Sequence, residues 1–329
     1  MSQRLSILIY HRVLPAPDPL RPDEIHAALF ECHMRWLRRV CRVLPLEDAV
    51  QRLRSGSLPP RALSLTFDDG YADNVDVALP ILRRLDLTAT FFIASGFLDG
   101  GRMWNDTVIE VLRHWRGNFI GIPGTSLSAL PTSTIAERRV AIARALPALK
   151  YLAPAQRQAA CDELARDAGA SLPSLMMSVA QVRELARAGM TIGAHTRTHP
   201  ILSCISRERA QAEIEGNRAE LESLIRKPVR LFAYPNGKPD TDYTTEHVHM
   251  LRDLGFCAAV STAPASATAA TDPLQLPRFT PWDRSVGRFL LRLAYVRHTA
   301  TPAVASQGRT EPEGPAVPAP QTRARGSVK

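Results

Sequence analysis

Two adjacent carboxylates, Asp68 and Asp69, follow the apolar run 62–67 and precede Gly70. Neighbouring carboxylates at the end of a strand repel each other, so both stay ionised only beside a cation, and otherwise one of them holds a proton. Such a pair suits acid–base chemistry or metal binding. Because Asp and Gly are also the residues that turns use, this segment alone is equally consistent with an ordinary turn.

Two histidines four residues apart, His195 and His199, follow a second predicted strand at 190–194. If the chain forms a helical turn there, the two imidazoles share a face and can bind one cation. With one aspartate they form a set of three ligands that leaves a position open for water, which is typical of a catalytic zinc site. The pair alone is more typical of a helix cap or a core histidine, and the nearby Asp pair shifts the balance towards a metal site.

Two further predicted strands also end in polar or tight-turn residues. His11 follows the strand predicted at 5–10, and Pro235-Asn236-Gly237 follows the one predicted at 229–234. In parallel α/β sheets, functional side chains gather at the carboxyl ends of the strands. We therefore expect these groups, the Asp pair and the histidine pair to meet at one rim of a sheet.

Strand and helix patterns alternate along most of the chain. Besides the strands above, strand patterns lie at 88–94 and 256–261, and amphipathic helical patterns lie at 25–40, 46–53, 74–85, 179–188, 207–225, 246–254 and 286–296. Repeated strand–helix units imply a mostly parallel sheet, either doubly wound or closed as a (β/α) barrel.

The predicted domain, residues 1–299, contains one stretch of different character at about 100–178. Helical patterns at 107–115, 134–149 and 155–168 interrupt the strand–helix alternation there, which indicates a helical insertion. Residues 300–329 are rich in Ala, Pro and Thr and are predicted to form a disordered C-terminal tail.

Composition excludes several classes of function. The chain has 329 residues and a net charge of +9, but it contains no dense Lys/Arg run, so we expect no nucleic-acid binding. Its five cysteines lack any C-x-x-C spacing, which argues against a disulfide framework and a thiolate metal site. The apolar run near the N-terminus is too short for a signal peptide, so we expect a cytoplasmic protein. The basic helix at 286–296 leaves peripheral membrane contact open, although a helix covering the barrel explains it better.

Three segments together resemble a known family. Thr66-Phe67-Asp68-Asp69-Gly70, His195-Thr196-Arg197-Thr198-His199-Pro200 and Phe232-Ala233-Tyr234-Pro235-Asn236-Gly237 are similar, in this order, to the first three motifs of the polysaccharide deacetylases with a NodB homology domain, carbohydrate esterase family four. The segment Ile9-Tyr10-His11-Arg12-Val13 looks like the N-terminal motif of the circularly permuted deacetylases that modify poly-N-acetylglucosamine exopolysaccharide. The resemblance implies a distorted (β/α)7-type barrel and metal-dependent removal of acetyl groups from sugars.

The resemblance also implies roles for individual residues. By motif position, Asp68 corresponds to the catalytic base, and Asp69, His195 and His199 correspond to the metal ligands, with Zn2+ as the expected ion. The main-chain N–H of Asn236, where the family usually has Tyr, corresponds to an oxyanion donor.

Two departures from the family pattern matter. Where the third motif commonly has an arginine, this chain has Ala233, and Arg278 is the candidate replacement that orients the base, against a surface arginine as the alternative. No convincing Leu-x-His motif near the C-terminus supplies the general acid, since His298 lies at the edge of the predicted tail. We therefore hypothesise that His11 is the acid rather than a core histidine.

Together these patterns predict a metal-dependent deacetylase. The expected substrate is an acetylated amino sugar, either in a polysaccharide or in its lipid-linked precursor, in exopolysaccharide biosynthesis. The alternative is a catalytically inactive member of the same fold that binds metal and carbohydrate. The intact Asp and His pairs favour the enzyme, whereas Ala233 favours the alternative.

Overall fold

A curled, 7-stranded sheet forms the centre of the protein. The computed structural model describes residues 3–169, 171–299 and 304–305. The strand order is β1-β3-β4-β7-β8-β9, with β2 paired to the start of β3, and the described strand pairs of this sheet are all parallel. The strands are β1 (Ser6–Tyr10), β2 (Arg42–Val43), β3 (Ala62–Phe67), β4 (Thr90–Ile93), β7 (Thr191–Ala194), β8 (Leu231–Ala233) and β9 (Ala258–Val260).

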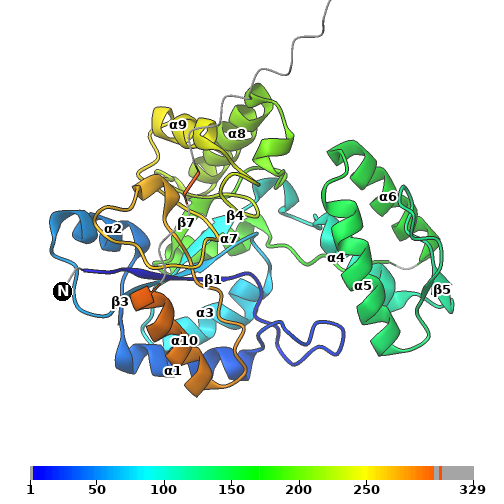
Figure 1. Ribbon diagram of the computed structural model, residues 1–329, viewed down its shortest axis with the longest axis horizontal. Helices are drawn as coiled ribbons and strands as arrows, with labels where there is room; N and C mark the ends of the chain where they lie inside the picture. The colour runs from blue at the N-terminus through cyan, green and yellow to red at the C-terminus, as the bar shows by residue number, and fades with distance from the viewer. Residues whose placement is uncertain (1–2, 170, 300–303, 306–329) are drawn as a thin grey trace, which may run out of the picture.

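Helices surround this sheet, which makes a half-barrel (Figure 1). They are α1 (Ala27–Val40), α2 (Leu46–Ser55), α3 (Leu79–Arg84), α7 (Val179–Arg187), α8 (Arg207–Ile225), α9 (Thr245–Asp253) and α10 (Val286–Thr299). The predicted α/β architecture is thus confirmed. In the described part of the chain, no helix is both long and apolar enough to cross a membrane.

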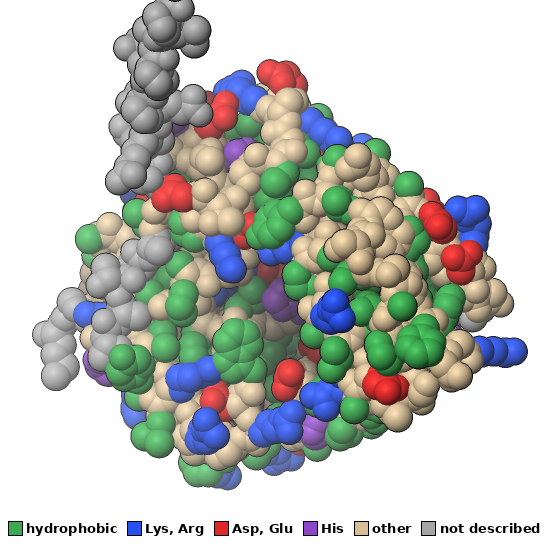
Figure 2. All heavy atoms as spheres, turned by 45° about the vertical axis from the view of Figure 1, so that its right-hand side comes forward, with side chains coloured by type: hydrophobic (Ala, Val, Ile, Leu, Met, Phe, Trp, Pro, Cys, Tyr) green, Lys and Arg blue, Asp and Glu red, His purple; other side chains and the backbone are tan. Residues whose placement is uncertain are grey.

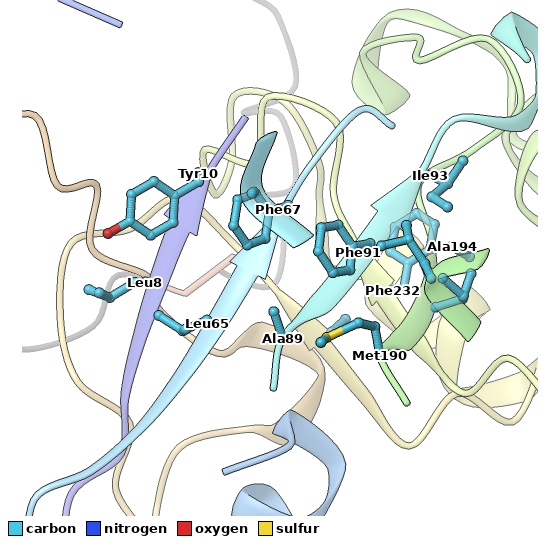
Figure 3. Close-up of a cluster of buried hydrophobic side chains, with 14 of the residues drawn as sticks. Leu8, Tyr10, Leu65, Phe67, Ala89, Phe91, Ile93, Met190, Ala194 and Phe232 are labelled. Carbon is cyan, nitrogen blue, oxygen red and sulfur yellow. The ribbon is translucent and has the colours of Figure 1, made fainter. Parts of the chain in front are cut away.

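Burial on both faces explains the continuous apolar character of the strands. All six residues of β3 are buried, as are all five of β1. Figure 3 shows side chains of neighbouring strands packed on one face of the sheet. The rings of Phe67 and Phe91 stack there, with centroids 4.7 Å apart. This packing makes the sheet a rigid base for the loops that follow the strands.

An extended segment, Leu276–Phe279, bridges the gap between the first and the last strand. Its Leu276 N–H donates to Ala259 O of β9 (2.8 Å), and its Phe279 N–H donates to Ile7 O of β1 (2.8 Å). The segment therefore lies between β1 and β9, and it carries Arg278 into the barrel.

The region of the predicted insertion contains three helices and a hairpin. They are α4 (Trp104–His114), α5 (Ile135–Lys150), α6 (Pro154–Asp167), β5 (Phe119–Ile120) and β6 (Leu130–Pro131). These elements lie together on the right of Figure 1 and share a hydrophobic cluster of their own, which includes Val108, Leu112 and Leu164. The hairpin was not predicted, because two paired residues per strand are too few to show alternation.

Two details differ from the sequence expectations or lie outside them. The helix predicted at 74–85 begins as a π-helix, η1 (Asn74–Ala78), before it continues as α3. The predicted tail lies outside the described residues, except for Val304 and Ala305.

Candidate active site

Asp68 is held by a buried arginine. Its two carboxylate oxygens accept hydrogen bonds from Nη1 and Nη2 of Arg278, at 2.7 and 2.6 Å. The Arg278 side chain is fully buried, contrary to the alternative of a surface arginine, and its Nε also donates to Ser261 O (2.9 Å). Burial alone would raise the pKa of Asp68, but the adjacent guanidinium outweighs this effect and holds the pKa below its ordinary value.

Asp69 points away from this pair and faces the two histidines. Its Oδ1 lies 3.3 Å from Nε2 of His195 and 3.4 Å from Nε2 of His199. One ligand atom from each of the three residues lies within 4.8 Å of the others. Adjacent carboxylates thus remain charged because each faces a different partner.

The histidine pair forms differently from the sequence expectation. No helical turn spans residues 195–200, so our prediction that the two imidazoles share the face of a helical turn is wrong. Instead, Thr196 and His199 adopt left-handed backbone conformations (φ 61° and 52°), which fold the loop back and bring the two rings to 4.7 Å between centroids.

Unusual backbone conformations recur in these loops. Asp69 (φ 76°) and Asn236 (φ 59°) are also left-handed, although neither is glycine. Each such residue costs roughly 1–3 kcal/mol and persists only where the surrounding structure enforces it. The same conformation occurs outside the motif loops, for example at Arg61 and Asp99, so it explains how these loops fold but does not by itself distinguish them from ordinary turns.

His195 has a fixed tautomer. Its Nδ1 lies 2.7 Å from Ala233 O and donates to this carbonyl, so Nε2 is the nitrogen that faces Asp69. Burial alone would lower the pKa of His195, but the adjacent carboxylates of Asp69 and Asp68 outweigh this effect and raise it. The main chain at position 233 thus contributes to the site even though its side chain is only a methyl group. Burial lowers the pKa of His199 to about 4, so this ring is neutral at pH 7 and also able to bind a cation.

His11 lies at the end of β1, on the same rim of the sheet as Asp68 and Asp69. Its side chain is exposed, which rules out the alternative of a core histidine. It is close enough to contribute favourably to the charged state of both carboxylates.

Asn236 follows β8 and lies beside Asp69 and His199 in one cavity of about 320 Å³. Within the described residues, its main-chain N–H has no hydrogen-bond partner. The structure thus places all seven sequence-predicted site residues at the carboxyl ends of the strands or on the closing segment next to them.

A larger cleft begins at His11. Its volume is about 750 Å³, and it extends between the barrel rim and α5. Its lining includes Val140 of α5 and Trp282, which are 58% and 65% exposed. Leu146 lines both cavities, so the cleft and the smaller cavity lie next to each other. In Figure 2 the surface is hollowed near the centre of the view, and a histidine side chain is visible inside.

The sequence profile of one family, described as polysaccharide deacetylase, matches residues 55–259, which is more than half of the chain. The chain belongs to the polysaccharide deacetylase family. All three motif loops of this deacetylase chain lie within the matched residues.

Solved structures show the same fold. The Streptococcus pyogenes deacetylase PplD in complex with acetate is 19% identical, with a TM-score of 0.62 and a similarity that covers 89% of this chain and 99% of PplD. IcaB from Ammonifex degensii is 20% identical, with a TM-score of 0.58, covering 90% of this chain and 98% of IcaB. Among curated proteins, YxkH of Bacillus subtilis (strain 168) is 20% identical over 267 residues, which are 80% of this chain and 67% of YxkH. The predicted distorted (β/α)7-type barrel of the NodB homology domain is confirmed.

The ligand set of this deacetylase family member fits a divalent cation. Oδ1 of Asp69 is buried and accepts no hydrogen bond within the described residues, so an orphaned anionic atom faces two imidazole nitrogens. Leaving such an atom without a partner is costly, and a cation between the three groups would remove that cost.

Sequence reasoning missed the residues that support the deacetylase loops from behind. Asn217 Oδ1 accepts the His195 N–H (2.9 Å), and Glu213 Oε2 accepts the main-chain N–H groups of Arg197 (2.9 Å) and Thr198 (2.8 Å). Both supporting residues lie on the inward face of α8. Two polar residues four apart on a face that packs against the sheet were the signal that could have revealed them.

Proposed function

We propose that this protein is a metal-dependent deacetylase that removes N-acetyl groups from an amino sugar, in a polysaccharide or in its lipid-linked precursor, during exopolysaccharide biosynthesis. The observation that carries the proposal is that the two adjacent carboxylates have different partners. Asp68 pairs with a buried arginine, and Asp69 faces two imidazoles that can bind a cation in their neutral form. Asp68 can therefore accept a proton, and Asp69 can bind a cation.

Asp69, His195 and His199 would hold the cation. Two imidazoles and one carboxylate are a donor set that zinc accepts, and we propose Zn2+. When bound, the cation supplies Lewis acidity, which polarises a carbonyl and lowers the pKa of water.

Asp68 is the proposed base. Arg278 holds both of its oxygens, so the carboxylate has a single orientation and stays ionised near neutral pH. It can therefore accept the proton of the attacking water. This arrangement also supports activity despite Ala233, because Arg278 takes the place of the missing arginine from another part of the chain.

The main-chain N–H of Asn236 is the proposed donor to the oxygen that becomes negative in the transition state. It lies in the same cavity as Asp69 and His199, and no described group occupies it. A preorganised donor of this kind is worth about 3–4 kcal/mol in comparable hydrolases.

His11 is the proposed general acid. Amines leave poorly unless they are protonated, so an amide substrate requires a proton donor beside the nitrogen. His11 lies where the 750 Å³ cleft begins, and the amine it would protonate carries the sugar. We therefore propose that the sugar occupies the cleft and the acetyl group occupies the smaller cavity next to it. The elements α4, α5 and α6 would form the outer wall as an insertion in the 1–299 domain.

The decisive experiment measures acetate release, with zinc added, from N-acetylglucosamine oligomers and from a lipid-linked N-acetylamino sugar. His11→Ala should keep its metal and lose about 10²–10⁴-fold in rate. Near-normal turnover of this variant would refute the role of His11. If the wild type binds zinc and oligosaccharide but releases no acetate from any substrate, the protein is an inactive binding member of the family.

A further inference from the structure

The position of His11 depends on its main chain rather than on contacts of its ring. The β1–β3 ladder ends one residue earlier, where Tyr10 O accepts the N–H of Asp68 (2.9 Å). Within the described residues, no hydrogen bond to the imidazole of His11 is present, and the side chain is exposed. Something other than the sheet must therefore fix this residue.

Side chains that follow the Asp pair in the sequence hold the main chain around His11. Asn74 Nδ2 donates to His11 O (2.8 Å). Asp73 Oδ1 accepts the Val13 N–H (3.1 Å), and its Oδ2 accepts Arg12 Nε (2.7 Å). The side chains of Asp73 and Asn74 thus bind the three consecutive residues 11–13.

Asn74 is poorly explained by stability alone. Its side chain is fully buried, yet its Oδ1 has no hydrogen-bond partner among the described residues. A buried amide with one unpaired oxygen costs free energy that an apolar side chain of similar size would not. Asn74 is also the first residue of the π-helix η1, and such local departures from α-helical geometry occur frequently at functional sites.

We propose that Asn74, together with Asp73, is a positioning residue that places His11 for proton delivery to the leaving amine. The inference rests on the proposed role of His11 as the acid. It connects the two halves of the site, because the segment that supplies Asp68 and Asp69 also fixes the acid across the cleft. The positions of Asp68, Asp69 and His11 relative to one another are therefore fixed by the same segment.

The test compares two substrates with different leaving groups. The leaving group of an N-acetylamino sugar is an amine, which needs a proton from the acid. The leaving group of 4-nitrophenyl acetate is a stabilised phenolate, which does not. Asn74→Leu keeps the branched shape and the number of side-chain heavy atoms but removes the donor. It should lower kcat/KM for the amide by about 10²-fold, the loss expected for a small misplacement of a reacting group. Ester hydrolysis and zinc content should stay near those of the wild type.

A matched control uses the other buried asparagine of the site. Asn217→Leu removes the support of His195, so zinc content, amide hydrolysis and ester hydrolysis should fall together. If Asn74→Leu folds poorly, Asp73→Asn provides the second variant: it keeps an oxygen for the Val13 N–H, loses the charge that Arg12 binds, and should show the same selective loss to a smaller degree.

Equal losses on both substrates, or no loss on either, in Asn74→Leu and Asp73→Asn would overturn the inference while the deacetylase proposal stands. His11→Ala supplies the reference for a selective loss. If this reference variant shows no difference between amide and ester, both the acid role and the inference fail. Absence of acetate release from the wild type would instead refute the proposed function.

Discussion

Arg278 holds both oxygens of Asp68 from a position 210 residues away in the sequence. The partners are both buried, so neither charge can be satisfied by water if the other is removed. A pair of this kind is costly to break, because the remaining charge is left without compensation in the interior.

Arg278→Met should therefore lower the free energy of unfolding by about 3–5 kcal/mol and abolish most acetate release. Urea unfolding at pH 7 measures the first effect. The double variant Asp68→Asn/Arg278→Met removes both charges and should be more stable than the single variant. A single variant as stable as the wild type would show that the pair does not contribute as its geometry indicates.

The three proposed metal ligands predict metal content directly. After loading with zinc and dialysis to remove the free ion, the wild type should retain about one equivalent of zinc. His195→Ala and His199→Ala should each lose most of it, because each variant lacks one of the three ligands. His114→Ala, which changes a histidine with a 44% exposed side chain in α4, serves as the control and should retain zinc. Full zinc loading of both ligand variants would disprove the assignment.

The backbone role of Asn236 predicts tolerance to loss of its side chain. Asn236→Gly keeps the main-chain N–H and suits the left-handed conformation (φ 59°), so activity should remain within about threefold of the wild type. Acetate release at saturating substrate measures this outcome. A loss of about 10²-fold or more would instead assign the function to the Asn236 side chain.

The cleft predicts an effect on substrate binding that is separate from chemistry. Trp282→Ala removes an exposed aromatic side chain that lines the cleft and should raise KM for oligosaccharides several-fold while kcat stays nearly constant, because Trp282 is not one of the proposed catalytic groups or metal ligands. Phe119→Ala is the matched control, since Phe119 is similarly exposed (61%) but lies in the β5–β6 hairpin. Equal KM values for the wild type and Trp282→Ala would place the sugar elsewhere.

His33 predicts a pH dependence of stability. Its ring is fully buried in α1 and stacks on Phe289 of α10, with centroids 4.3 Å apart. Burial lowers the pKa of His33 from 6.5 to about 4. The unfolded chain therefore binds more protons than the folded chain between these values. Stability is retained above pH 6.5 and falls by up to roughly 3 kcal/mol as the pH drops towards 4.

His33→Leu should lack this part of the pH dependence. The difference between the unfolding free energies of the wild type and the variant, measured between pH 7 and pH 4, should shift by up to roughly 3 kcal/mol in favour of the variant as the pH falls. Parallel curves for the two proteins would mean that His33 is protonated without penalty in the folded state.

Much of the site was predictable because parallel strands impose a simple rule. The ends of β1, β3, β7 and β8 face one rim, so residues such as His11 and Asp69 could be placed together from local patterns alone. Arg278 was found only as a candidate, because its burial and its pairing with Asp68 depend on how the chain returns between β1 and β9.

Other features had no local signature. The histidine pair looked like a helical turn, and only the left-handed conformations at Thr196 and His199 show how the loop folds. The support from Asn217 and the anchoring of His11 by Asn74 depend on contacts 22 and 63 residues apart in the sequence. Hydrophobic periodicity carries no information about such pairs.

The segment Leu276–Phe279, which lies between the first and the last strand, also sets the order in which the site can assemble during synthesis. Asp68 is translated 210 residues before Arg278, which corresponds to roughly 10–40 s at ordinary rates of elongation. During this interval the carboxylate lacks its arginine and the barrel lacks its closing segment. The nascent chain can therefore complete its helices up to α9 and most of its sheet before the proposed base gains the arginine that orients it, so we expect activity only once the end of the domain has been made.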